Sequence, residues 1–276
     1  MPKKFIVLFI AAGLLVAASQ VGAAKPETTP RTLTLPPQAF KVADNIFYMG
    51  KTPDPQSGKL LEGYAIVHYK DQPIKPEKPG KPSKILCYAF LANGAKWKIV
   101  EDWMVNAANN SRLSSAFIFD NLTFDIAKWE DAADGVLENS ISKNILGNGS
   151  VTTSDLSVDF GKLNGNNEVY FAPLSNQNII ALTYIWGISG GPVANRELDE
   201  WDQIYNDNYG WSLNGEPTKM DFENIATHEL GHSVGLDDLY KSNCSPETMY
   251  GYASYGETKK QTLESGDVTG VSQLYR

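Results

Sequence analysis

The segment at residues 226–238, A-T-H-E-L-G-H-S-V-G-L-D-D, constrains this chain more than any other. His228 and His232 are four residues apart, so on an α-helix both imidazoles project from one face, one turn apart. That spacing allows both rings to bind one tetrahedral Zn²⁺ at about 2.0–2.1 Å each. Because two imidazoles leave the ion under-coordinated, the segment also predicts a third ligand close by.

The residues after the second histidine offer that ligand. Gly235 permits a backbone turn with positive φ, after which the chain can reverse and present Asp237 or Asp238. The alternative is an amphipathic helix with surface His and Glu, which leaves the agreement of the spacings unexplained. The chain has three histidines, and we expect the third, His68, to be an exposed strand residue rather than a ligand.

The stretch H-E-L-G-H-S-V-G-L-D-D resembles the metzincin zinc signature H-E-x-x-H-x-x-G-x-x-H, with Asp238 in the place of the third His. A minority of metzincins use Asp there. The resemblance implies that His228, His232 and Asp238 bind Zn²⁺. It also implies that Glu229 acts as general base and then general acid in peptide-bond hydrolysis.

The last 55 residues carry a second likeness, within a resemblance that covers about residues 93–276. Met249, in S-P-E-T-M-Y, lies eleven residues past the third-ligand position, and metzincins place a methionine turn beneath the zinc ligands. Residues 263–275 resemble the closing helix of the matrixin domain, L-x-x-x-D-I-x-G-I-x-x-L-Y. Matrixins usually have Pro after Met-Tyr, whereas this chain has Gly251, so the shape of the specificity pocket cannot be carried over.

The resemblance also implies the fold. The expected class is α+β, with a twisted, mostly parallel sheet that has an antiparallel edge strand. The zinc helix lies below the sheet, and a small C-terminal subdomain holds the methionine turn and the closing helix. In this family the strand at residues 179–186 is the sheet edge that lines the cleft, where an extended polypeptide substrate adds as an antiparallel strand.

Apolar periodicity predicts the individual elements. Residues 117–137 have the spacing of an amphipathic helix. Thr218 or Asp221 is the expected N-cap of the zinc helix, and Ile225, Leu230 and Val234 are expected to pack under the sheet. The core residues expected on the first helix are Phe124, Ile126, Ala127, Trp129, Ala132 and Ala133. Strand candidates lie at residues 64–69, 96–100, 103–106, 150–160, 168–171, 179–186 and 198–205.

Residues 1–24 have the features of a secretory signal peptide. Lys3 and Lys4 precede an apolar run at residues 5–18, and small residues at 21–24 form a cleavage site. The alternative is a membrane anchor, but the run is shorter than the about 20 residues that a span requires. We therefore expect a secreted, extracellular product with no membrane contact after cleavage.

The charge balance limits the partners. The chain has 24 basic and 32 acidic residues, and loss of Lys3 and Lys4 with the leader changes the formal charge from −8 to −10 (22 against 32). An acidic balance argues against nucleic acid or an anionic membrane as a partner. The expected partner is a polypeptide substrate, bound by a monomer.

The chain divides into three parts. After the leader, residues 25–84 form an N-terminal segment that ends in a Pro- and Lys-rich linker, either a propeptide or an accessory layer. Residues 85–276 form the zinc-protease domain. Cys87 and Cys244 are expected to form a disulfide in an exported chain. The alternative is that the Cys87 thiolate keeps a proenzyme latent on zinc, as in matrixins, but its neighbours do not resemble the Arg-Cys-Gly of that switch.

The sequence thus predicts a secreted zinc-dependent endopeptidase. One alternative is a catalytically silent, zinc-containing binding or adhesion module, against which the retention of Glu229 argues. Another is a metallohydrolase of a non-peptide amide, against which the strand-pairing edge at residues 179–186 argues. Asp199, Asp202 and Asp207 are candidate ligands of a structural Ca²⁺, although scattered acids more often lie on solvated faces.

Overall fold

The computed structural model describes residues 29–30, 32, 35–70, 86–156 and 163–276. The predicted signal peptide, nearly all of the predicted linker and part of the strand predicted at residues 150–160 lie outside these ranges.

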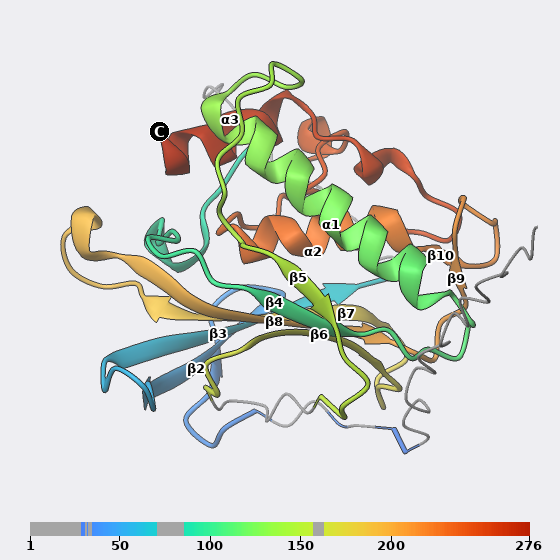
Figure 1. The fold of residues 1–276 in the computed structure, drawn as a ribbon, viewed down its shortest axis with the longest axis horizontal. Helices are drawn as coiled ribbons and strands as arrows, with labels where there is room; N and C mark the ends of the chain where they lie inside the picture. Colours follow the sequence, from blue (N-terminus) through green and yellow to red (C-terminus); the bar gives the residue numbers. More distant parts are fainter. Residues whose placement is uncertain (1–28, 31, 33–34, 71–85, 157–162) are drawn as a thin grey trace, which may run out of the picture.

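An eight-stranded sheet in the order β1-β2-β3-β7-β8-β6-β4-β5 forms the base of the molecule (Figure 1). Strands β4, β5, β6 and β8 run parallel to one another, and β7, β3, β2 and β1 continue the sheet with antiparallel pairings. The bounds are β1 Phe40–Lys41, β2 Ile46–Pro53, β3 Leu60–Tyr69, β4 Trp103–Asn106, β5 Gly149–Val151, β6 Asn167–Ala172, β7 Ile179–Ile188 and β8 Glu197–Asn206. A separate parallel pair joins β9 (Trp211–Ser212) and β10 (Met220–Asp221).

Three α-helices lie on one side of this sheet (Figure 1). They are α1 (Ser115–Asp131), α2 (Phe222–Ser233) and α3 (Ser265–Tyr275), so the predicted zinc helix and closing helix are both confirmed as helices. Asp221 caps α2, as predicted, by accepting the backbone N–H of Asn224 at 3.0 Å. Short 3₁₀ helices cover Leu91–Asn93, Ala132–Asp134, Val193–Asn195, Ser242–Cys244 and Lys259–Gln261.

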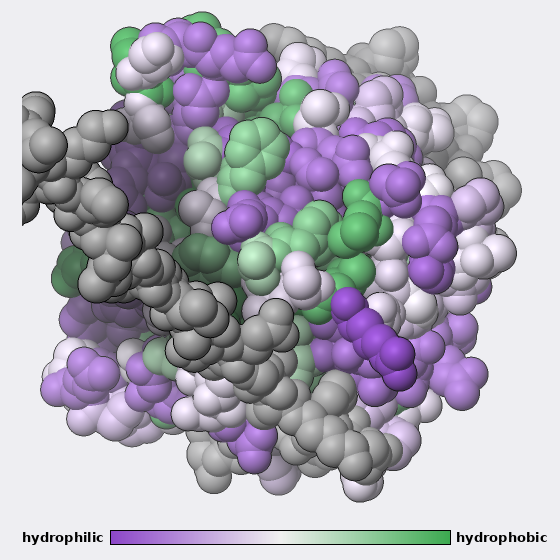
Figure 2. Space-filling view, turned by 45° about the vertical axis from the view of Figure 1, so that its right-hand side comes forward, coloured by the Kyte–Doolittle hydropathy of each residue, from purple (hydrophilic) through white to green (hydrophobic). Residues whose placement is uncertain are grey.

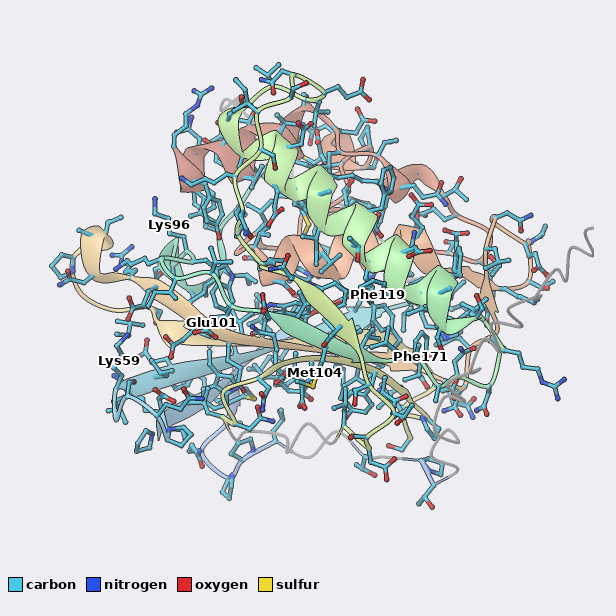
Figure 3. All side chains as sticks on the ribbon, viewed as in Figure 1. Lys59, Lys96, Glu101, Met104, Phe119 and Phe171 are labelled. Carbon is cyan, nitrogen blue, oxygen red and sulfur yellow. A yellow bond between two sulfur atoms is a disulfide. The ribbon has the colours of Figure 1, made fainter. Side chains whose placement is uncertain are left out.

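Side chains on the two faces of the sheet belong to two separate cores. On β4, Trp103 and Val105 face the helices, whereas Met104 packs against the core on the other face. Figure 3 shows Phe119 of α1 on the helical side of the sheet. The predicted core residues of α2, Ile225, Leu230 and Val234, are fully buried in the core beneath the helices. The helix that carries the candidate site is therefore fixed along its apolar side.

The expected core face of α1 is partly wrong. Ile126, Trp129, Ala132 and Ala133 are buried as predicted, whereas Phe124 is 60% exposed and Ala127 is also exposed. Helical residues advance by about 100° each, so positions 122, 126, 129 and 133 share one face while 124 and 127 lie on the opposite one. The Phe124 ring instead contacts the ammonium of Lys128, 4.7 Å from the ring centroid.

The strand predictions are confirmed for β3, β4, β6, β7 and β8 within a few residues. Residues 96–100, however, do not form a strand; Trp97 makes only an isolated bridge to Leu198. Of the strand predicted at 150–160, the described residues 150–156 contain only the end of β5, which spans Gly149–Val151. The chain therefore enters the sheet at β4, later than the apolar pattern indicates.

Strand β7 is not the edge of the sheet, so that expectation is wrong. It pairs with β8 on one side and antiparallel with β3 on the other, from Glu62↔Gly187 to Tyr69↔Ile179. The antiparallel edge strand is β1. The cause is the segment at residues 40–69, whose three strands extend the sheet beyond the position expected for its end.

Much of the face of the molecule drawn in Figure 2 is hydrophilic. On the face in Figure 2, hydrophobic residues form separate areas among hydrophilic ones. Within the described ranges, no helix has both the length and the apolar character needed to cross a membrane.

Candidate metal centre

Helix α2 ends in a left-handed turn that reverses the chain. Gly235 has φ +104° and donates its N–H to the carbonyl of His232 at 2.9 Å, while Leu236 donates to the carbonyl of Gly231 at 2.9 Å. A Cβ at position 235 would lie 3.0 Å from the carbonyl oxygen of Ala95. Both the positive φ and this close approach require glycine here. The chain after the turn therefore returns alongside α2.

The two imidazoles of α2 present free lone pairs to one point. Nδ1 of His228 donates to the carbonyl of Thr248 at 2.7 Å, and Nδ1 of His232 donates to the carbonyl of Leu236 at 2.9 Å. Because a carbonyl can only accept, each Nδ1 carries a hydrogen and each Nε2 has a free lone pair. Both Nε2 atoms are buried and have no hydrogen-bond partner among the described residues. Burial lowers the pKa of His228 to about 3, which keeps the ring neutral, as metal binding requires.

Asp238 lies beside these two nitrogens. Its Oδ1 is 3.1 Å from Nε2 of His228, and its Oδ2 is 3.7 Å from Nε2 of His232. Tetrahedral zinc with bonds of 2.0–2.1 Å places its ligand atoms roughly 3.4 Å apart, so this donor set fits the ion. Asp237 instead accepts the backbone N–H of Asp238 at 2.8 Å, and burial raises its pKa to about 6.

Glu229 is fully buried between α2 and the sheet. Its Oε2 accepts a hydrogen bond from Oγ1 of Thr183 on β7, and its Oε1 lies 2.9 Å from Nδ1 of His68. Burial raises the pKa of the Glu229 carboxyl. A carboxyl group in this environment suits proton transfer, because its affinity for a proton is increased.

His68 lies in a strand, as expected, but the expectation that it is exposed is wrong. Its ring is 1% exposed and lies against the ring of His228, with centroids 4.2 Å apart. His68, His228 and Glu229 each offer a ligand atom within 4.8 Å of the others. Asn45, from the same N-terminal segment, donates through Nδ2 to Oδ2 of Asp238. Sequence reasoning missed both residues because no local pattern reveals the strand with which a given segment pairs.

Met249 lies beneath α2, as predicted for a methionine turn. It is 1% exposed, and its sulfur would lie 2.2 Å from a Cβ added to Gly231, so only glycine fits at that point of the helix. The turn also holds the residues that follow Gly235. Leu239 donates its N–H to the carbonyl of Met249 at 2.8 Å, and Gly251 donates to the carbonyl of Leu239 at 2.9 Å.

Asp267 of α3 holds the methionine turn in place. Its Oδ2 accepts the N–H of Thr248 at 2.7 Å, and its Oδ1 accepts the N–H of Met249 at 3.1 Å. The carbonyl of Thr248 in turn orients the ring of His228. The closing helix is thus connected to the candidate metal site through two hydrogen bonds in sequence, a role that its sequence motif does not reveal.

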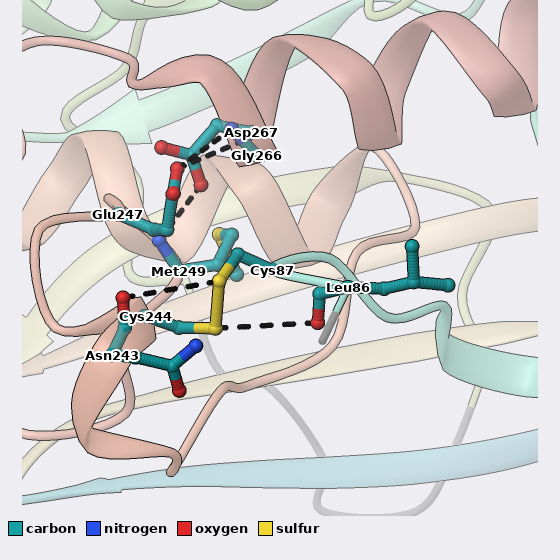
Figure 4. Close-up of a disulfide and its surroundings, with 8 residues drawn as sticks. All are labelled: Leu86, Cys87, Asn243, Cys244, Glu247, Met249, Gly266 and Asp267. Carbon is teal, nitrogen blue, oxygen red and sulfur yellow. Dashed lines mark hydrogen bonds between the residues drawn. A yellow bond between two sulfur atoms is a disulfide. The ribbon is translucent and has the colours of Figure 1, made fainter. Parts of the chain in front are cut away.

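The predicted disulfide between Cys87 and Cys244 is confirmed, with a sequence separation of 157 (Figure 4). Close to it, Glu247 accepts the N–H groups of Gly266 and Asp267 at 2.9 and 3.2 Å, which ties the same loop to α3 (Figure 4). With Cys87 in a disulfide, its thiolate does not act as a zinc ligand in this form of the protein.

Two groups of three potential metal ligands occur within the described part of the chain, and both include His228. Neither includes Asp199, Asp202 or Asp207, the candidate calcium ligands. Asp207 instead accepts the backbone N–H of Asn110 at 2.8 and 3.1 Å. The geometry therefore gives these acids no common site.

A third ligand delivered by a glycine turn, above a methionine turn, distinguishes the metzincin class from other peptidases that share the H-E-x-x-H helix. Within that class, the family model of the matrixins matches residues 120–276, more than half of the chain, and the chain belongs to the matrixin family. No curated protein matches it. Membership confirms the family resemblance and the metzincin fold class, and it places the chain among the zinc-dependent peptidases.

Proposed function

We propose that this protein is a secreted endopeptidase in which His228, His232 and Asp238 bind the catalytic zinc and Glu229 transfers the proton. One observation carries the proposal. Nε2 of both histidines and Oδ1 of Asp238 lie together, are buried, and have no hydrogen-bond partner among the described residues. Buried polar atoms are rarely left without partners, so three electron-donating atoms at one point indicate that a cation binds there.

Glu229 supplies the acid–base chemistry. When bound, zinc acts as a Lewis acid that polarises the scissile carbonyl and makes the attacking water more acidic. Glu229 accepts the proton from this water and delivers it to the leaving amine. The hydroxyl of Thr183 holds one oxygen of Glu229, so that the carboxylate keeps its position during both transfers.

The substrate is an extended polypeptide that pairs with the side of β7 that β3 occupies in this structure. This orientation is supported by the antiparallel pairing that β7 already makes on that side with β3 of the same chain. Main-chain hydrogen bonding of this kind places few demands on substrate side chains. Secretion is supported by the sequence of residues 1–24.

The test compares the full chain with Glu229→Gln, which keeps the shape of the side chain. Zinc content is measured together with hydrolysis of casein and of a quenched-fluorescence peptide library, before and after limited proteolysis, with and without a chelator. Both proteins should bind one zinc, and only the wild type should cleave, with a loss of roughly 10²–10⁴-fold in the variant. Thr183→Ser, which retains the hydroxyl, is the matched control and should remain active.

Two results would argue against the endopeptidase assignment. Stoichiometric zinc without cleavage in any form of the wild type would favour a zinc-containing binding module. Chelator-sensitive hydrolysis of non-peptide amides, with peptides untouched, would favour a different metallohydrolase.

A further inference from the structure

Strand β3 occupies the whole outer side of β7. Eight residue pairs join the two strands, from Glu62↔Gly187 to Tyr69↔Ile179. Lys70 then forms a parallel bridge with Ala253, which lies in the segment that follows the methionine turn. Residues 62–70 thus run along β7 and continue past the candidate metal site, the course that the proposed function gives to a substrate.

His68 connects this strand to the catalytic carboxylate. Its Nδ1 lies 2.9 Å from Oε1 of Glu229, and its ring packs on that of His228. The two partners are 1% and 0% exposed. The other ring nitrogen of His68 is buried without a hydrogen-bond partner among the described residues. Because the pair is closed off from solvent, Glu229 is not accessible to water or substrate while β3 lies in this place.

Asn45 makes an independent contact from the same segment. Its Nδ2 donates to Asp238, and its carbonyl accepts the N–H of Val67 on β3 at 2.9 Å. Asn45 is 2% exposed. Two side chains of the N-terminal segment thus engage two of the proposed site residues, and the backbone links one of them directly to β3.

We propose that residues 40–69 form an autoinhibitory segment, in which β3 takes the place of the substrate on β7 and His68 binds Glu229. The proposal rests on the proposed function. Once one strand has paired with β7, no backbone donors or acceptors remain on that side for another. Covalent attachment gives the segment an effective concentration of about 1 mM, which a substrate at micromolar concentration does not match. Cleavage between residues 70 and 86 ends the covalent attachment of the segment, so inhibition then depends on the protein concentration.

The experiment uses the full chain with a specific protease site introduced between residues 71 and 85. The rate constant kcat/KM for a quenched peptide is measured before cutting, and then after cutting at protein concentrations from micromolar to nanomolar. We expect the intact chain to be slow and the cut chain to gain at least about 100-fold on dilution, because the noncovalent segment dissociates.

A synthetic peptide of residues 40–70 should restore inhibition in trans. The His68→Ala peptide should bind at least about tenfold more weakly, because it leaves the hydrogen bond to buried Glu229 unmade. The Leu60→Ala peptide is the matched control and should inhibit like the parent, since Leu60 is 55% exposed at the start of β3. In the intact chain, His68→Ala should raise basal kcat/KM and leave the zinc content unchanged.

Exchange of a labelled 40–70 peptide into the cut protein, measured by fluorescence anisotropy, provides a readout that does not require catalysis. Exchange that depends on His68, together with bound zinc and no cleavage at any dilution, would support the segment's contact and refute the proposed peptidase. An intact chain as active as the cut one would overturn the autoinhibition and leave the peptidase standing.

Two further outcomes would also overturn the autoinhibitory segment. Loss of far-UV circular dichroism on dilution of the cut protein would make residues 40–69 a structural part of the domain. Self-cleavage within residues 62–70, detected by intact mass, would make β3 a substrate rather than an inhibitor.

Discussion

The imidazole of His68 and the carboxylate of Glu229 lie 2.9 Å apart although 161 residues separate them in the chain. Neither residue is accessible to solvent. They meet because β3, which carries His68, pairs with β7, and Thr183 of β7 in turn contacts Glu229 of α2. The N-terminal segment is therefore a part of the site's geometry, whatever its fate in the mature protein.

Asp238→Asn should weaken zinc binding by more than about 100-fold. Mutation of residues that only hydrogen-bond to a metal ligand already lowers metal affinity by about 10–100-fold, and Asp238 is proposed to bind the metal directly. Asp237→Asn is the control. Its amide oxygen can still accept the N–H of Asp238, so zinc affinity should change little. Competition with a chromophoric chelator measures both constants. Equal losses in the two variants would contradict the assignment of Asp238.

Asp267→Asn should lower both stability and zinc affinity. The new side-chain NH₂ group would face the N–H groups of Thr248 and Met249, which are donors like itself. The lost hydrogen bond should lower the free energy of unfolding by about 1–3 kcal/mol. Zinc affinity should fall roughly tenfold, because Thr248 orients His228. Urea unfolding and chelator competition at pH 8 are suitable, since burial raises the pKa of Asp267 to about 7.

The control for Asp267→Asn is Thr269→Ala, at an exposed position on the same helix. It should leave zinc affinity unchanged. Loss of stability without loss of zinc affinity in Asp267→Asn would show that α3 does not position the ligand.

Gly235→Ala should destabilise the protein by about 1–3 kcal/mol, because alanine is strained at φ +104° and its Cβ meets the carbonyl of Ala95. It should also weaken zinc binding, since the turn positions Asp238, the proposed third ligand. Gly58→Ala shares a positive φ but has open space around it. Gly58→Ala, the control, should lower the free energy of unfolding by only about 1 kcal/mol and leave zinc affinity unchanged. Thermal unfolding measures the stability of both variants, and chelator competition measures their zinc affinity.

Asp125→Asn should flatten the dependence of stability on pH. Burial raises the pKa of Asp125 to about 7, from 3.8 in the unfolded chain, although Lys128 opposes the rise. Between these values the folded state retains a proton that the unfolded state releases. The contribution to stability is therefore complete below about pH 4 and is lost as pH rises through 7, by up to about 4 kcal/mol.

Urea unfolding from pH 4 to 8 measures this difference. Asp120→Asn, an exposed position on the same helix, should keep the wild-type profile. Parallel profiles for wild type and Asp125→Asn would contradict the predicted effect.

Much of the candidate site could be read from the sequence because its signals are local. The four-residue spacing of His228 and His232 acts within one helical turn, and Gly235 acts on a single backbone turn. Met249 and the closing helix follow within 40 residues. The partly wrong face of α1 shows the limit of such reasoning, since Phe124 satisfies an approximate periodicity but lies on the solvent side.

The environment of the site depends on contacts between distant segments. Thr183, His68 and Asn45 reach Glu229 and Asp238 only because β7 and the N-terminal strands assemble in one sheet. A strand's alternating pattern defines its two faces but not its neighbour, because backbone hydrogen bonds are the same for every partner. The proposed ligands of the site therefore follow from short spacings in the sequence, whereas the strand that covers them could be identified only in the folded chain.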